Sequence, residues 1–414
     1  MKKLLWLALL SLCVLTPTAG AQVTVIKAGR LVDPEAGTAA RDQLIVVEAG
    51  KVTAVGAGLS IPAGAQVIDL SAAYVLPGLF DCHTHMLTTW DPLAGLSPSQ
   101  EAMQPLGVHM IQGVVNARTM LEAGFTTVRD VGNAPEYADA ALRDAINAGW
   151  IPGPTMIIAG KIITPFGGQN RLRPGRPDLF KEEYIYADTR DEMRKAVREN
   201  LHYGARVIKI VVGGIGGYRY TADDVRFIVE EASAAGVRVA AHCDSDLDAR
   251  NAIAGGVASI EHGPAMTEET LLLMKKAGVV LVGTDFPEGI EKEQGYQPPL
   301  ARRFYERLQR AHKVGAPMAF GSDVLLTRRE KGRGAYALDF LENYVRVGMR
   351  PAEILRMMTT DAARLVGVEK QRGRIAVGLA ADIIATPADP LADVYALRQV
   401  GFVMKDGRVF KHVR

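Results

Sequence analysis

The chain carries almost no net charge. Its 414 residues include 48 basic and 46 acidic side chains, and no basic block or acidic tail interrupts the mixture. Removal of the N-terminal leader described below takes away two lysines and leaves 46 residues of each sign. Proteins that bind nucleic acid or anionic membranes usually gather basic side chains on one surface. The sequence therefore argues against nucleic acid or a membrane as the main partner.

Cysteine is also scarce, with three residues in the chain. Cys13 lies in the leader, which leaves Cys82 and Cys243, each beside a histidine. An exported protein with two cysteines can form one disulfide, but adjacent residues of a strand point to opposite sides. If His83 and His242 point into a site, both thiols point away from it. We therefore predict two buried free thiols.

Beyond the first 21 residues there is no long apolar run. Two lysines precede an apolar segment at residues 4–15, which is too short to span a bilayer as a helix, and an Ala-x-Ala pattern ends at Ala21. This arrangement is typical of a secretory signal peptide. We predict cleavage after Ala21 and export to the periplasm or the medium. The alternatives are an uncleaved anchor and a lipoprotein linked through Cys13, which Leu12 disfavours because a small residue is expected there.

The remaining length predicts a large α/β domain with a smaller companion. Short β-branched runs fill residues 22–77 and return in residues 368–414, so the two ends are expected to pair into a small β-sandwich. Between them, over residues 78–367, strands and helices alternate. Eight such units over about 290 residues fit a (β/α)₈ TIM-like barrel. A doubly wound sheet is the alternative.

Four of the eight histidines lie at predicted strand ends. His83 and His85 end the first strand, and side chains at i and i+2 of a strand point the same way. His242 ends the fifth strand, His262 the sixth, and Asp323 the eighth. In a barrel, functional side chains lie at the C-terminal ends of strands, and imidazole and carboxylate suit a divalent metal such as zinc. Together these residues indicate a metal site.

Lys209 lies inside the apolar run at residues 207–212, where a charged ammonium is costly to bury. Burial near metal ligands lowers the pKa of a lysine. A neutral amine can react with carbon dioxide to give an anionic carbamate that bridges two metals. The alternative is a lysine that reaches water at the strand end.

These residues together resemble the amidohydrolase superfamily, in its binuclear group with a carboxylated lysine. The matching elements are residues 77–85, Lys209, His242, His262 and residues 321–323, and residues 378–383 resemble the small β-sandwich of that family. The resemblance covers essentially the whole mature chain. Within the superfamily, the chain most resembles the branch of imidazolonepropionase-like proteins, Xaa-Pro dipeptidases and ochratoxin amidases.

The resemblance implies a specific ligand set. His83, His85 and Asp323 would hold one metal, and His242 and His262 the second. Lys209, as N6-carboxylysine with its carbamate drawn from carbon dioxide, and a hydroxide would bridge two divalent ions, expected to be Zn²⁺. Asp323 would act as general base and then as general acid. The family also suggests a homo-oligomer.

Substrate contacts are predicted from the glycine-rich residues 213–217. Tyr218, Arg219 and Tyr220 follow them, and guanidinium and phenol groups are suitable donors to a free carboxylate. A mobile surface loop is the alternative. The weaker candidates are on a long loop of the kind that often acts as a lid: Arg171, Arg173 and Arg176.

Some residues depart from the pattern. Relatives often have Gly-Gly-His where this chain has Gly167-Gly168-Gln169, which puts substrate contacts from that loop in doubt. Four histidines match no motif position and are interpreted as surface or packing residues: His109, His202, His312 and His412.

The sequence thus predicts a zinc-dependent hydrolase of a linear amide, such as an Xaa-Pro dipeptide or an N-acyl amino acid including ochratoxin-like amides. A cyclic-amide hydrolase resembling imidazolonepropionase is one alternative, but cytosolic histidine degradation fits poorly with a signal peptide. The other is a non-catalytic solute-binding barrel. A complete ligand set with Asp323 argues against it, because a binding protein needs no proton shuttle.

Overall fold

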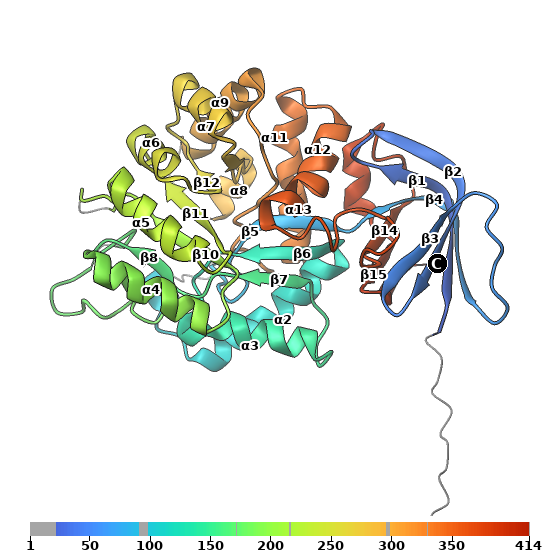
Figure 1. Ribbon diagram of the computed structural model, residues 1–414, viewed down its shortest axis with the longest axis horizontal. Helices are drawn as coiled ribbons and strands as arrows, with labels where there is room; N and C mark the ends of the chain where they lie inside the picture. Colours follow the sequence, from blue (N-terminus) through green and yellow to red (C-terminus); the bar gives the residue numbers. More distant parts are fainter. Residues whose placement is uncertain are drawn as a thin grey trace, which may run out of the picture.

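The computed structural model describes residues 22–90, 98–170, 172–214, 217–294, 299–328 and 330–413. Figure 1 shows a region of alternating strands and helices with a separate sheet beside it. The predicted α/β class is confirmed. The predicted leader at residues 1–21 and Arg171 lie outside the described residues.

The separate sheet is built from both chain ends. Its seven strands are β1(Thr24–Asp33), β2(Thr38–Glu48), β3(Lys51–Gly56), β4(Gln66–Pro77), β14(Ile383–Thr386), β15(Phe402–Lys405) and β16(Arg408–His412). β4 pairs antiparallel with β14, which joins the two ends. Apolar side chains such as Ile26, Ile45 and Phe402 bury one face. The expected pairing of the ends is confirmed, but all seven strands belong to one sheet, so a face-to-face sandwich stays a prediction.

The strands of the larger region form two parallel sheets. β5(Leu79–Thr84), β6(Phe125–Asp130) and β7(Thr155–Ile158) make one. The other has the order β13(Val280–Val282), β12(Ser259–His262), β11(Arg238–Cys243), β10(Val207–Val211), β8(Ile162–Thr164) and β9(Tyr184–Tyr186). β5, β6 and β10 are buried along their whole length, as expected for strands covered on both faces.

Helices follow most of these strands and lie outside them (Figure 1). They are α1(Pro98–Glu101), α2(Leu106–Glu122), α3(Ala138–Asn147), α4(Arg190–His202), α5(Ala222–Ser233), α6(Asp246–Gly255), α7(Glu268–Ala277), α8(Glu288–Glu293), α9(Leu300–Val314), α10(Arg333–Ala337), α11(Leu341–Arg346), α12(Pro351–Met357) and α13(Thr360–Val366). Capping boxes start α4, α5 and α6, which fixes where each preceding loop ends.

The eighth predicted strand is not a regular strand. Met318 makes a single bridge to Leu281 of β13. Backbone hydrogen bonds then connect residues 319–323 to β13 on one side and to β5 on the other. On the β5 side, Cys82 N–H donates to Phe320 O and Asp323 N–H donates to His83 O, each at 2.8 Å. Asp323, at the end of this segment, has φ +53°, which is not a strand conformation. The paired strands therefore form two sheets, and a closed eight-stranded ring stays a prediction.

None of the helices in the described parts of the chain is both long and apolar enough to cross a bilayer.

Candidate metal centre

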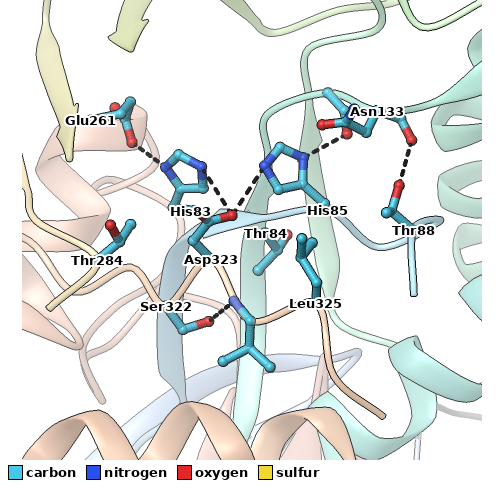
Figure 2. Close-up of polar contacts among 12 residues, drawn as sticks. His83, Thr84, His85, Thr88, Asn133, Glu261, Thr284, Ser322, Asp323 and Leu325 are labelled. Atoms are coloured by element: carbon cyan, nitrogen blue, oxygen red, sulfur yellow. Dashed lines mark hydrogen bonds and ion pairs between the residues drawn. The ribbon is translucent and has the colours of Figure 1, made fainter. Parts of the chain in front are cut away.

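His83 lies near the end of β5 and His85 directly follows it, and both rings are turned toward Asp323 (Figure 2). Nε2 of His85 lies 3.3 Å from Asp323 Oδ1, and Nε2 of His83 lies 3.6 Å from the same oxygen. Within the described part of the chain, these three residues form the one His/Cys/Asp/Glu group whose ligand atoms all lie within 4.8 Å. Two imidazoles and a carboxylate at this separation can hold a divalent ion.

His242 and His262 complete a continuous cluster of imidazoles. Their ring centroids lie 4.5 Å apart, and the His262 ring lies 4.7 Å from that of His83. Nδ1 of His262 is 3.8 Å from Asp323 Oδ2. The arrangement follows from parallel pairing, because β11 and β12 are neighbours, His242 is the next-to-last residue of β11 and His262 is the last residue of β12.

Lys209 is buried on β10, next to β11, and lines the same cavity as His242, His262 and Asp323. Burial lowers the pKa of its ammonium to about 8 and the pKa of His83 to about 3, an effect that the charge of Lys209 strengthens. Both groups are therefore inclined to the neutral forms that bind metals or react with carbon dioxide.

Each of three rings is oriented through Nδ1. His83 Nδ1 lies 2.7 Å from Glu261 Oε2, His85 Nδ1 lies 2.9 Å from Gly132 O, and His262 Nδ1 lies 2.9 Å from Thr284 Oγ1. A carboxylate and a carbonyl can only accept, so His83 and His85 carry hydrogen on Nδ1 and present the Nε2 lone pair to the site. Nε2 of His83 is buried with no hydrogen-bond partner, which suits a metal ligand.

Sequence reasoning missed Glu261 and Arg129. Glu261 Oε1 accepts from Arg129 Nη2 at 2.7 Å and from Ser259 Oγ at 2.5 Å, and Arg129 Nε donates to Cys82 O at 2.6 Å. Burial alone would raise the pKa of Glu261, but Arg129 and His83 hold it well below its usual range. The available signal was a charged side chain inside each of two short predicted strands, Arg129 in residues 126–130 and Glu261 in residues 258–262.

Asp81 and Ser322 fix Asp323 against β5. Asp81 Oδ1 accepts from His83 N–H at 3.1 Å and Ser322 N–H at 3.0 Å, and Ser322 Oγ donates to Asp81 Oδ2 at 2.5 Å. Gly321 is required between them, because a Cβ there would lie 2.3 Å from Val282 Cγ1 and 2.8 Å from His83 Cβ.

The centre opens into a cavity of about 640 Å³. Its wall includes aromatic side chains and the guanidinium groups of Arg219 and Arg303. Arg219 Nη1 lies 3.6 Å from Asp248 Oδ1, so this predicted contact residue is held at the wall. Gln169, whose role the sequence left in doubt, also lines the cavity, with its amide nitrogen 3.2 Å from His242 Nε2.

The other described residues that were predicted to contact the substrate do not line the cavity. Tyr220 is fully buried and its hydroxyl donates to Ala187 O at 2.7 Å, so its predicted role in substrate binding is wrong. The chain turns inward there to enter α5, which its capping box begins at Thr221. Tyr218 is 54% exposed and lies off the cavity wall, as do the exposed Arg173 and Arg176.

The remaining predictions concern packing. Cys82 and Cys243 are buried free thiols, as predicted. His109 is buried within α2, His202 and His412 are exposed, and His312 is half-buried on α9.

Imidazoles and a carboxylate that gather at the strand ends of an α/β protein are the ligand types of a divalent-metal site. Residues 74–410 match the model of the amidohydrolase family, and the chain belongs to that family. It is 30% identical to the ochratoxinase of Aspergillus niger over 444 residues, which cover 96% of this chain and 88% of the relative.

Two further relatives are similar over most of their length. The crystal structure of a Xaa-Pro dipeptidase with bound methionine in the active site matches at 28% identity and a TM-score of 0.81, covering 94% of this chain and all of that one. The imidazolonepropionase of Kosmotoga olearia is 22% identical over 405 residues, or 90% of this chain and 91% of the relative. The predicted resemblance to these branches is confirmed.

Proposed function

We propose that this hydrolase of carbon–nitrogen bonds cleaves a linear amide whose leaving group is an amino acid with a free carboxylate. The observation that carries the proposal is the convergence of His83, His85, His242, His262 and Asp323 beside buried Lys209 at one cavity.

The residues present fit two divalent ions, for which we propose zinc. His83, His85 and Asp323 would hold one ion and His242 and His262 the other, with carboxylated Lys209 between them; the orphaned, buried Nε2 of His83 supports this. Bound metals would supply a water that is acidic near neutral pH and a positive field on the scissile carbonyl.

The protein's own groups then move the proton and orient the substrate. Asp323 takes the proton of the attacking water on its carboxylate and returns it to the leaving nitrogen. Arg219 binds the free carboxylate, since a guanidinium makes paired, charge-assisted hydrogen bonds. Asp248 keeps the guanidinium at the cavity wall.

A linear substrate is favoured over a cyclic one by two findings. The ochratoxinase is 30% identical and the dipeptidase 28%, against 22% for the imidazolonepropionase. The dipeptidase structure also holds methionine, an amino acid with a free carboxylate. Asp323 at the ligand cluster favours an enzyme over a solute-binding protein.

The proposal includes the wider organisation of the chain. Residues 78–367 would close as a (β/α)₈ barrel, supported by the backbone bonds of residues 319–323 to both neighbours and by Arg206 N–H donating to Ile158 O at 2.8 Å across β10 and β7. Residues 22–77 and 368–414 would form the sandwich, residues 1–21 a leader for export, and the mature protein a homo-oligomer.

The test is a screen of Xaa-Pro dipeptides, other dipeptides, N-acyl amino acids and cyclic amides, with zinc and bicarbonate present. We expect hydrolysis of linear amides and its loss, with loss of bound metal, in Lys209→Ala and His242→Ala. His202→Ala on the exposed end of α4 is the matched control. Turnover of cyclic amides alone would reject the substrate class, and full turnover by Lys209→Ala would reject the site.

A further inference from the structure

Two buried carboxylates have no part in the proposed chemistry. Glu101, at the end of α1, and Glu183, just before β9, are each 4% exposed, and both line the cavity. An isolated buried carboxylate is costly unless a donor or a cation satisfies it. Their hydrogen bonds therefore need to be accounted for.

Glu101 is not satisfied by the protein. Its Oε1 is buried and has no hydrogen-bond partner in the described residues. The nearest base is Nδ1 of His109, at 3.3 Å, but that nitrogen lies 3.1 Å from Leu87 O, which takes its hydrogen. Nε2 of His109 is also buried without a partner. Burial lowers the pKa of His109, but Glu101 raises it above its usual value, so a protonated His109 supplies one positive charge beside two carboxyl groups.

Glu183 has one neutral donor. Its Oε2 accepts from Asn133 Nδ2 at 2.6 Å, and no lysine or arginine of the described chain forms an ion pair with it or with Glu101. The nearby guanidinium of Arg333 is committed to the carbonyl oxygens of His85 and Thr88, each at 2.5 Å. The pair therefore forms an acidic part of the wall, with His109 as the one neighbouring base that pairs with it in the described chain.

This acidic wall borders the metal ligands on the side of His85. Asn133 follows Gly132, which accepts the Nδ1 hydrogen of His85, and its own carbonyl accepts from Thr88 at 3.1 Å (Figure 2). Arg219 lies after β10, and β8 separates β10 from β9. The cavity wall thus carries two carboxyl groups near the His85 loop and a guanidinium in the segment after β10.

We infer that Glu101 and Glu183 bind a cationic nitrogen of the substrate, so that the enzyme prefers linear amides carrying an ammonium group, such as unblocked dipeptides, to neutral N-acyl amino acids. This inference rests on the proposed function. An ammonium has three donors and no acceptor, which matches the free Oε1 of Glu101 and the carboxylate of Glu183. The nitrogen belongs either to the α-amino group or to a basic side chain.

Matched substrates separate these sources. Alanyl-proline and propanoyl-proline differ by the α-ammonium alone, and 6-aminohexanoyl-proline and hexanoyl-proline differ by a remote ammonium. We expect kcat/KM to be about tenfold or more higher for the ammonium member of one pair, since charge-assisted hydrogen bonds are the strong ones. The pair that responds identifies the source. Equal kcat/KM within both pairs would overturn the inference and leave the proposed function standing.

Conservative variants assign the preference to these residues. For the pair that shows a preference, Glu101→Gln and Glu183→Gln should each bring the ratio of kcat/KM, ammonium substrate over neutral analogue, toward one. Glu182→Gln is the control, because its side chain is adjacent in sequence but 61% exposed, and it should keep the ratio. An unchanged ratio in both Glu101→Gln and Glu183→Gln would overturn the assignment.

A binding measurement separates this inference from the proposed function. The same pairs are titrated into the zinc-loaded protein by calorimetry. Tighter binding of an ammonium member without any hydrolysis would reject the proposed reaction but keep the cation site. Equal binding within both pairs would reject the cation site.

Discussion

Replacing Glu183 with glutamine should stabilise the protein, and more at high pH than at low pH. Burial raises the pKa of Glu183 to about 7, and the charge of Glu101 adds to this while His109 opposes it. Glutamine has the same shape, carries no charge and can still accept the hydrogen bond from Asn133. The variant therefore removes the cost of the buried charge with little change in packing.

The magnitude follows from the two pKa values. The unfolded chain releases this proton near pH 4.3, whereas the folded protein keeps it to about pH 7. Because the folded pKa is raised, the stability contributed by protonated Glu183 is fully present below about pH 4 and is lost as the pH rises to about 7. Glutamine does not titrate and so avoids that loss. The free energy of unfolding of Glu183→Gln should therefore exceed that of the parent by about 1 kcal/mol at pH 5 and by roughly 3–4 kcal/mol at pH 8.

The assay is thermal unfolding of both proteins at pH 5 and pH 8. With about 2.1 cal/mol/K per residue over roughly 390 residues, Tm should rise by about 1 °C at pH 5 and about 4 °C at pH 8. The exposed Glu182→Gln should shift Tm at neither pH. An equal Tm for Glu183→Gln and the parent at pH 8 would show that Glu183 is neutral or paired in the folded protein, and would refute the reasoning.

Three further predictions concern the metal centre and its loop. Glu261→Gln should weaken metal binding about 10–100-fold in a chelator competition, because His83 loses its anionic partner; unchanged affinity would contradict this. Gly321→Ala should lower metal content and activity because its Cβ meets Val282 and His83, whereas Gly401→Ala, with open space around it, should not. Tyr220→Phe should cost about 1 kcal/mol of stability and leave KM unchanged; a raised KM would restore its predicted contact with substrate.

The cluster of proposed metal ligands was predictable because strand geometry is local. A period of two places His83 and His85 on one side, and parallel pairing places the ends of β10, β11 and β12 together. The rule that functional residues lie at strand ends also found Asp323, although its segment is not a regular strand. Backbone hydrogen bonds of residues 319–323 to β5 and β13 hold that segment in the position a strand would have.

The missed residues depend on contacts that no local pattern contains. Arg129 and Glu261 are 132 residues apart in the chain, and neither shows its partner in sequence. Glu101 and Glu183 line one cavity only because α1 and the segment before β9 are brought to it by the fold. Tyr220 was misassigned for a related reason: composition marked the loop as polar and glycine-rich, but only the path into α5 shows that the phenol is buried.

Part of the strained backbone lies at the proposed centre. Of the nine residues other than glycine with a positive φ in the described chain, four lie at or next to it: Asn133 (+54°), His262 (+66°), Thr284 (+51°) and Asp323 (+53°). Each such residue costs on the order of 1–3 kcal/mol and persists only where its surroundings fix it. Here His262 is bonded to Thr284, and Asp323 N–H to His83 O. His262 and Asp323 are themselves proposed metal ligands and Thr284 orients His262, so relieving the strain at these residues would move the side chains on which the proposed chemistry depends.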